Sequence, residues 1–385
     1  MTSPRSDPPV LVTDDAGLQT VTDRFKHTSR IALDTEAASF HRYVDRVYLI
    51  QVSSDRETAI VDPLAVTDLT PLADCLASAG IEVVLHDADY DLRILDRDYG
   101  IRVRHVFDTR LAAQLAGEPS VGLGALLEKY CGVTIDKKFQ RADWSRRPLP
   151  DDMIAYAADD TRYLPTLRDI LERRLLEMGR LEWAREEFGR LEGIRWSRGS
   201  TDNEEAYLRL KGAKALRGRR ARGVLRAVHG WREDTARALD RAPFRVVDNM
   251  VLLNVAKAAP TTIEALQQQA RVPASIARRY GKSLLDAVRE ALALPESELP
   301  VIERTRRPPP DPAYDAGLER LKQLRNRRAE ELGMDSGLLC PNGTLQALSR
   351  ASPNTARDLD AIGELRKWQR DVFGDDALLA ALHGT

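Results

Sequence analysis

Cysteine, aromatic residues and long apolar runs are all scarce in this chain of 385 residues. Its three cysteines, Cys75, Cys131 and Cys340, lie far apart, with no CxxC pair beside them. This spacing argues against a zinc site or a disulfide framework and favours a reducing compartment. No apolar stretch approaches the roughly 20 residues that cross a bilayer, and the polar residues 1–9 have no secretory signal pattern. We therefore expect a cytoplasmic protein that does not associate with membranes.

Net charge is also nearly absent, since the formal charge is −1 although 30% of the residues are charged. A near-neutral total can conceal an acidic part and a basic part, so it excludes no class of partner. A Gly-rich phosphate loop of the GxxxxGK[ST] type is missing, which leaves nucleotide triphosphate hydrolysis without support. The length of the chain predicts two or three domains.

The first part of the chain, residues 1–202, is predicted to form an α/β domain with a mixed sheet. Strand-like runs come first as an antiparallel meander and then alternate with helical runs. The expected strands cover residues 31–33, 47–53, 58–62, 81–85 and 103–107. The expected helices cover residues 69–78, 89–99, 109–116 and 123–131, and helical character continues from 150 to about 192. We expect a loose start over residues 1 to about 22 and a loop over 137–150.

The remainder of the chain is predicted to be helical, in two units joined by a stiff linker. Residues 203–294 show helical patterns and no convincing strand, and residues 314–385 form a second helical unit. Between them, residues 295–313 contain Pro308, Pro309, Pro310 and Pro312 among mixed charges, which is typical of a stiff linker. The two units share a rough plan of helices and loops, which suggests a diverged internal duplication.

Two carboxylates follow the first strand-like run, in Ile31-Ala32-Leu33-Asp34-Thr35-Glu36. Asp34 and Glu36 lie two positions apart, so in an extended backbone both side chains leave the same face. Adjacent carboxylates repel each other unless a cation lies between them, and a hard divalent cation such as Mg²⁺ takes oxygen ligands. By itself this triplet also fits a solvated strand end, so its significance depends on partners elsewhere.

Two further acidic segments supply candidate partners. Asp87, Asp89 and Asp91 follow the strand expected at residues 81–85, and spacing alone does not choose among the three. Tyr156 and Asp160 lie four positions apart on a predicted helix, so phenol and carboxylate share one helical face. Taken singly, the first segment also fits a solvated helix start and the second a surface pair.

The order and spacing of these segments resemble the ribonuclease D family, within the DEDD superfamily of 3′→5′ exonucleases. Its first motif, Asp-x-Glu, corresponds to Asp34-Thr35-Glu36, and its second, an Asp five residues after a His, selects Asp91 after His86. Its third motif, Tyr-x-x-x-Asp of the tyrosine subclass, corresponds to Tyr156 and Asp160 and selects Asp160 over Asp159. Flanking segments are similar too: Leu49-Ile50-Gln51, Val61-Asp62-Pro63-Leu64, Phe107-Asp108-Thr109 and the run from Asp143 to Leu149.

The resemblance implies a ribonuclease H-like mixed-sheet exonuclease domain followed by two all-α domains of the helicase-and-RNase-D C-terminal (HRDC) type. It implies that Asp34, Glu36, Asp91 and Asp160 hold two divalent ions, Mg²⁺ or Mn²⁺, and that Tyr156 orients the attacking water. The implied activity is trimming of the 3′ ends of structured RNAs such as tRNA precursors, with release of nucleoside 5′-monophosphates. We expect the protein to act as a monomer.

A run of cations in the first helical unit is a candidate RNA-binding surface. No acidic residue interrupts it between Ala206 and Arg232. The run consists of Lys211, Lys214, Arg217, Arg219, Arg220, Arg222 and Arg226. Beside a nuclease domain, such a run favours contacts with phosphates, although it also fits a solvated helix face.

Other functions stay open at this point. A DNA 3′–5′ exonuclease would use the same carboxylates, because they do not read the sugar. A catalytically weak nucleic-acid-binding protein is less favoured, since all four acidic positions are present. A structural adaptor without a nucleic acid partner is disfavoured by those four positions and by the basic run.

Overall fold

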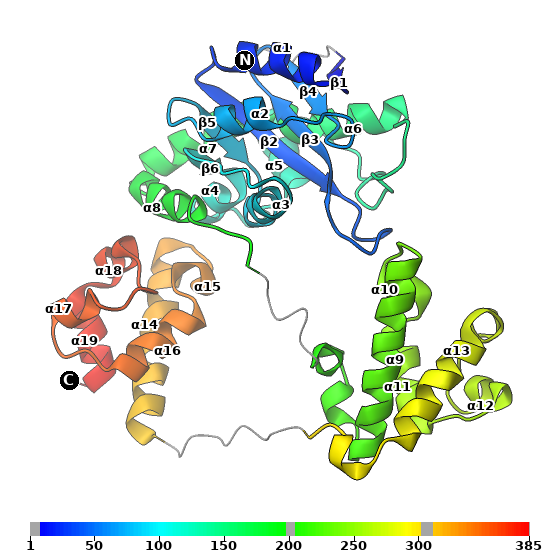
Figure 1. Cartoon of the computed structure of the whole chain (residues 1–385). Helices are drawn as coiled ribbons and strands as arrows, with labels where there is room; N and C mark the ends of the chain where they lie inside the picture. The colour runs from blue at the N-terminus through cyan, green and yellow to red at the C-terminus, as the bar shows by residue number, and fades with distance from the viewer. Residues whose placement is uncertain (1–7, 198–204, 302–310, 385) are drawn as a thin grey trace.

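The computed structural model of this chain describes residues 8–197, 205–301 and 311–384. The N-terminal part is an α/β domain in which helices cover both faces of a six-stranded sheet, and two all-helical units follow it (Figure 1). This arrangement confirms the predicted fold class. In the described part of the chain, no helix is both long and apolar enough to span a membrane.

The sheet is mixed and has the strand order β1-β4-β3-β2-β5-β6. The central strands β2, β3 and β4 are antiparallel neighbours, as the meander predicted, whereas β5 and β6 run parallel to β2. The short β1 adds to the far edge, parallel to β4. The strands are β1 Val10–Val12, β2 Arg30–Ala37, β3 Val47–Ser53, β4 Thr58–Val61, β5 Glu82–Leu85 and β6 Val106–Asp108.

Alternation along β2 divides its side chains between the two faces of the sheet. Ile31 and Leu33 pack into the core beneath the first three helices, while Ala32 joins the core on the opposite face. On that opposite face, α6 crosses β2, β3 and β4. The helices of this domain are α1 Asp15–Phe25, α2 Thr70–Leu76, α3 Asp89–Tyr99, α4 Thr109–Leu115, α5 Leu123–Cys131, α6 Asp151–Arg162, α7 Leu164–Glu177 and α8 Leu181–Leu191.

Two sequence expectations for this domain were wrong. The start of the chain, expected to be loose, contains β1 and α1, and the Asp14 carboxylate caps α1 by accepting from the Gly17 N–H at 2.7 Å. The strand that bears the acidic pair, expected to end at the carboxylates, continues to Ala37. Both runs are ordered by tertiary contacts, since β1 pairs with β4 and the second half of β2 pairs with β3. Pairing across a sheet leaves little trace in local periodicity.

Each helical unit has a long helix near its start, followed by further helices. The first contains the 3₁₀ turns η2 Ala206–Arg209 and η3 Ala213–Ala215, then α9 Arg219–Ala238, α10 Pro243–Val246, α11 Asn249–Ala258, α12 Ile263–Gln268, α13 Ala274–Ala293 and η4 Glu296–Glu298. The second contains α14 Pro312–Leu332, α15 Ser336–Leu339, α16 Asn342–Ala351, α17 Ala356–Leu359, α18 Lys367–Phe373 and α19 Asp375–His383. Residues 302–310 of the predicted linker lie outside the described residues.

A repeated buried arginine shows that the two units are copies of one plan. In α9, Arg232 donates to the Val247 carbonyl and to the Asn249 side chain at 3.3 and 2.6 Å. In α14, Arg325 donates in the same way to the Cys340 carbonyl and the Asn342 side chain at 3.1 and 2.7 Å. The three matched pairs all lie 93 positions apart, which supports the duplication suggested by the sequence. The same interval relates the N-cap threonines of α12 and α17 and the left-handed residues that end α11 and α16.

The second helical unit packs tightly against the α/β domain. Buried side chains of α4, α5, α7 and α8 form one continuous apolar core with those of α14–α19. Trp183 of α8 stacks on Trp368 of α18 with ring centroids 5.1 Å apart. Glu186 accepts from the N–H groups of Lys367 and Trp368 at 2.8 and 2.9 Å, so a carboxylate of one domain caps a helix of the other.

The first helical unit meets the α/β domain at the loop between β2 and β3, which extends from the sheet toward α10 (Figure 1). Arg42 on this loop forms an ion pair with Asp240 at 3.0 Å. Arg237 of α9 donates to the Tyr43 hydroxyl at 3.0 Å, and its guanidinium lies 5.1 Å from the centre of the Tyr43 ring. This loop leaves β2 directly after the acidic pair, so one segment joins the predicted site to the helical unit.

Candidate active site

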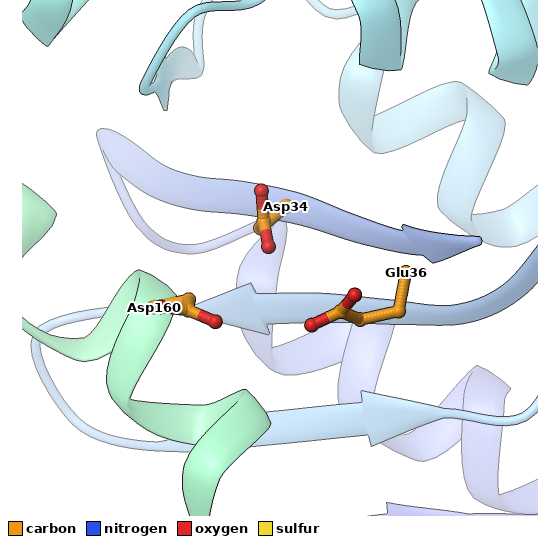
Figure 2. Close-up of side chains that lie close together, drawn as sticks. All are labelled: Asp34, Glu36 and Asp160. Atoms are coloured by element: carbon orange, nitrogen blue, oxygen red, sulfur yellow. The ribbon is translucent and has the colours of Figure 1, made fainter. Parts of the chain in front are cut away.

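Three carboxylates converge between β2 and α6. Asp34 and Glu36 leave the same face of β2, as their spacing predicts, and α6 brings Asp160 over that face (Figure 2). One carboxylate oxygen from each residue lies within 4.8 Å of the others. All three side chains are partly exposed, which leaves the cluster accessible from solvent.

The electrostatics of this cluster suit a cation. Burial raises the pKa of Asp34 well above its usual range, and repulsion from Asp91, Asp160 and Glu36 raises it further. The pKa of Glu36 is raised well above its usual range by burial and then by Asp160 and Asp91, and burial raises the pKa of Asp160 to about 7. The folded chain therefore disfavours the fully ionised cluster. A divalent cation with oxygen ligands would remove that repulsion, so the donor set fits Mg²⁺ or Mn²⁺.

Asp91 lies beside this group but its carboxylate points to a different partner. It is buried in the first turn of α3, where it accepts a hydrogen bond from the Thr35 hydroxyl. Thr35 is the residue between Asp34 and Glu36, so this bond joins α3 to the acidic stretch of β2. The Asp91 charge contributes to the raised pKa of Asp34, which places the two carboxylates within electrostatic reach.

The structure distinguishes Asp91 from its two acidic neighbours, which spacing alone did not. Asp87 is paired with Arg110 at 2.5 Å, and Asp89 is held by two hydrogen bonds from Arg93, each 2.8 Å long. Both of those side chains are exposed and already neutralised. Asp91 is buried, and its pKa is raised to about 7, chiefly by burial. Asp91 is therefore the member of this segment that is buried and within electrostatic reach of Asp34, although its carboxylate bonds to Thr35 and lies outside the group of three clustered carboxylates.

Tyr156 lies beside Asp160 at the edge of a pocket of about 190 Å³. Its ring packs against Phe139 and Trp144, with centroid separations of 5.7 and 6.1 Å. Burial and the nearby charges of Asp160 and Glu36 raise the pKa of the phenol. The phenol therefore stays protonated at neutral pH and can donate a hydrogen bond, but it cannot serve as a strong base.

His86, which sets the register of the second motif, has a local structural contact. Its Nδ1 lies 2.9 Å from the Thr109 hydroxyl oxygen, and that hydroxyl donates to the Leu85 carbonyl at 3.0 Å. The hydroxyl hydrogen is thus committed, so Nδ1 carries a hydrogen and acts as the donor. Burial lowers the pKa of His86 to about 4, and the imidazole is therefore neutral near pH 7.

Several residues that position the centre carried no role in the sequence analysis. Asp108 accepts from the backbone N–H of Ala88 at 2.8 Å and from that of Asp87 at 3.2 Å, which fixes the turn leading into α3. Arg147 forms two bonds of 2.5 and 2.7 Å with Asp62, and so fastens the loop over residues 137–150 to the sheet. Asp62 and Arg147 both fall in family-like segments, but 85 residues separate them and no spacing rule relates them.

The predicted basic surface divides into two sets. Arg219 donates to the Leu299 carbonyl at 2.7 Å, Arg220 to the Leu294 carbonyl at 2.5 Å, and Arg226 to the Glu298 carbonyl at 3.0 Å. These three arginines hold the end of α13 and the turn after it against α9. Lys211, Lys214 and Arg217 precede α9 and are exposed, and Arg222 is half-buried on α9.

The mixed sheet and its acidic centre define an exonuclease domain with a carboxylate site for divalent metal, followed by two helical domains. Residues 9–176 match the 3′–5′ exonuclease domain family, and residues 221–288 and 315–382 each match the HRDC domain family. The chain belongs to the ribonuclease D family. It is 33% identical over 373 residues to ribonuclease D of Granulibacter bethesdensis, across 96% of this chain and 92% of that protein.

Another relative and two solved structures are also similar to this chain. Ribonuclease D of Pseudomonas paraeruginosa is 32% identical over 96% of both chains. The crystal structure of Escherichia coli RNase D, described as an exoribonuclease involved in structured RNA processing, is 28% identical, with a TM-score of 0.70 over 98% of this chain and 99% of that one. The catalytic core of RRP6 from Trypanosoma brucei is 27% identical, with a TM-score of 0.67 over 76% of this chain and 84% of that one.

Proposed function

We propose that this protein is a 3′–5′ exoribonuclease that trims the 3′ ends of structured RNAs, tRNA precursors foremost, and releases nucleoside 5′-monophosphates. The observation that carries the proposal is the convergence of Asp34, Glu36 and Asp160 within 4.8 Å. Membership of the ribonuclease D family supports the choice of RNA as substrate.

The four acidic residues would form the metal site together. Asp34, Glu36 and Asp160 would hold two Mg²⁺ or Mn²⁺ ions, with Asp91 completing the site. Two divalent ions bound there would supply an activated water and would stabilise the leaving 3′ oxygen. The Thr35 hydroxyl orients the Asp91 carboxylate by donating to it. Asp108 keeps the turn before α3 in place, and so keeps Asp91 beside β2.

In this scheme Tyr156 donates a hydrogen bond and does not transfer a proton. Its raised pKa keeps the phenol neutral, and its ring is held between Phe139 and Trp144. A fixed phenol beside Asp160 can orient a water for attack on the terminal phosphodiester. Lys138 lines the same pocket, where its ammonium group pairs with Asp152 at 2.9 Å.

The first experiment tests whether Asp34 and Asp160 are metal ligands. Asp34→Asn and Asp160→Asn each replace a charged ligand by an amide of the same shape, so both variants should lose nearly all turnover with Mg²⁺ or Mn²⁺. Asp159→Asn is the matched control, because Asp159 lies next to Asp160 but faces Arg162 at 3.5 Å. Rates close to the parent in either of the first two variants would overturn the assignment of the metal ligands.

The substrate class is tested with matched 3′-tailed RNA and DNA, with the products sized over time. We expect stepwise shortening of the RNA and accumulation of nucleoside 5′-monophosphates. Faster shortening of the DNA would favour the alternative of a DNA exonuclease, since the carboxylates themselves are blind to the sugar. Internal cleavage products would contradict the exonucleolytic mode.

The exposed cations before α9, Lys211, Lys214 and Arg217, are the members of the basic run that we propose to contact RNA phosphates. Their exposure supports this, whereas Arg219, Arg220 and Arg226 already hold carbonyl groups of their own domain. The cytoplasmic location, the monomeric state and the choice between Mg²⁺ and Mn²⁺ stay predictions.

A further inference from the structure

Two exposed phenylalanines from different domains meet at the junction between the β2–β3 loop and the first helical unit. Phe40 lies on the β2–β3 loop, four residues after Glu36, and Phe244 lies on α10 of the first helical unit. Their ring centroids are 5.8 Å apart in an edge-to-face arrangement. The exposed fractions are 42% for Phe40 and 47% for Phe244. Large aromatic side chains left this open on both sides of a domain junction are candidates for a ligand contact.

Cations accompany the aromatic pair. The Arg141 guanidinium lies over the Phe40 ring, 5.1 Å from its centre, and the Phe40 carbonyl accepts a hydrogen bond from Arg245. The His41 ring also bonds to the Arg141 carbonyl at 2.9 Å, which ties the two loops together. Aromatic faces and guanidinium planes set beside positive charge are the elements that bind single-stranded nucleic acid without reading its sequence.

This surface continues into the proposed active site. Two residues before Arg141, Phe139 packs edge-to-face on Tyr156 at 5.7 Å, and Lys138 lies 4.6 Å over the Phe139 ring. Lys138, Phe139 and Tyr156 line the same pocket beside Asp160. The segment 138–141 therefore connects the aromatic pair, through Arg141 on Phe40, with the pocket, through Phe139 on Tyr156.

Polar contacts hold the junction together independently of the two phenylalanines. Arg42 pairs with Asp240 at 3.0 Å and donates to the Ser145 hydroxyl at 2.6 Å, so it connects both domains and the loop over residues 137–150. The Tyr43 N–H donates to Asp240 at 3.3 Å, and the Ala242 N–H to the His41 carbonyl at 3.3 Å. Because these bonds already fix α10 against the loop, the exposed rings are free to serve another role.

We propose that Phe40, Arg141 and Phe244 form a stacking platform for the bases of a single-stranded 3′ RNA tail on its way to the acidic centre. The proposal rests on the proposed function, since it assumes an RNA substrate entering at Tyr156. The platform holds the bases upstream of the scissile nucleotide through π-faces, so it tolerates every base. It would give this enzyme a preference for RNA whose 3′ end is unpaired over several nucleotides.

The test measures binding in full-length protein that carries Asp34→Asn, so that no RNA is consumed. The probe is an oligoribonucleotide with a single-stranded 3′ tail and 2-aminopurine at successive tail positions, whose fluorescence reports base stacking. Phe40→Leu and Phe244→Leu keep an apolar contact at the junction but remove the π-face. Each should weaken tail binding about 5- to 150-fold and lose the stacking signal at one tail position, whereas Phe244→Trp should keep both.

Met250→Ala is the matched control, because Met250 is an exposed apolar residue of the same helical unit, 58% exposed, and lies on α11 and not on α10. It should bind the tail as the parent does. If the two leucine variants also bind the tail like the parent, with the stacking signal unchanged, the platform is refuted and the rings are packing between domains. Degradation of RNA by the wild-type protein is measured separately, so failure of the proposed function is distinguished from failure of the platform.

Discussion

Replacing Asp91 by asparagine should make the metal-free protein more stable, and more so as the pH rises. In the folded chain burial raises the pKa of Asp91 to about 7, whereas an unperturbed aspartate ionises near pH ~3.9. The folded state therefore holds this proton more tightly than the unfolded state does. Between these two values the unfolded state binds fewer protons, so the free energy of unfolding decreases as the pH rises.

The size of this effect follows from the two pKa values. From about pH 5.5 to about pH 7.5, a single group with these constants lowers the free energy of unfolding by about 2 kcal/mol. In a domain of this size that corresponds to about 4–8 °C in Tm. The asparagine side chain carries no charge, yet its carbonyl oxygen can still accept the hydrogen bond from Thr35. The advantage of Asp91→Asn over the wild type should therefore widen by this amount between the two pH values.

The assay is thermal unfolding in EDTA at both pH values, repeated with excess Mg²⁺. Asp89→Asn is the control, since Asp89 is exposed and paired with Arg93, and it should show no such pH-dependent gain. Mg²⁺ should stabilise the wild type more than Asp91→Asn, because the ion relieves repulsion that the variant has already lost. An equal pH dependence of Tm in the wild type and in Asp91→Asn would refute the electrostatic reasoning.

Two further predictions concern the phenol and the docked helical unit. Tyr156→Phe should lower the exonuclease rate by about 10²-fold, in the range of a positioned hydrogen-bonding group, while calorimetric titration finds unchanged metal affinity; loss of metal binding would instead make Tyr156 a structural part of the centre. Trp368→Ala removes a buried ring that stacks on Trp183 and donates to Glu187 at 2.8 Å, so it should cost about 3–5 kcal/mol of stability. Leu176→Ala, at a side chain that is 64% exposed, should leave Tm unchanged, and an equally unchanged Tm for Trp368→Ala would contradict the shared core.

Much of the centre could be predicted because its geometry is local. Asp34 and Glu36 share a face through the period of two in a strand, and Tyr156 and Asp160 share one through the turn of a helix. The approach of Asp160 to the acidic pair is not local, because it requires α6 to cross β2. In the sequence, only the order of the family motifs indicated it. The motif order likewise selected Asp91, but its bond with Thr35 appears only when α3 is packed beside the strand.

Contacts between residues far apart in the chain could not be predicted, because they leave no pattern in the sequence. Glu186 caps α18 from 181 and 182 residues away, and Arg147 reaches Asp62 across 85. In the basic run the pattern of charges is visible in the sequence, but the partners of the individual side chains are not. Its charges indicated a candidate RNA-binding surface, which stays a prediction, and the structure adds that Arg219, Arg220 and Arg226 donate to carbonyl groups beyond α13.

The shared core of the α/β domain and the second helical unit has a consequence for synthesis of the chain. The apolar faces of α7 and α8 leave the ribosome long before the residues that cover them, since roughly 190 positions separate Leu191 from Leu382. At about 5–20 residues per second, that interval lasts about 10–40 s. During it the nascent nuclease carries an uncovered apolar surface, which a chaperone can recognise. A chain cut short by a damaged message would keep that surface exposed, so the last segment to be translated completes the fold of the first.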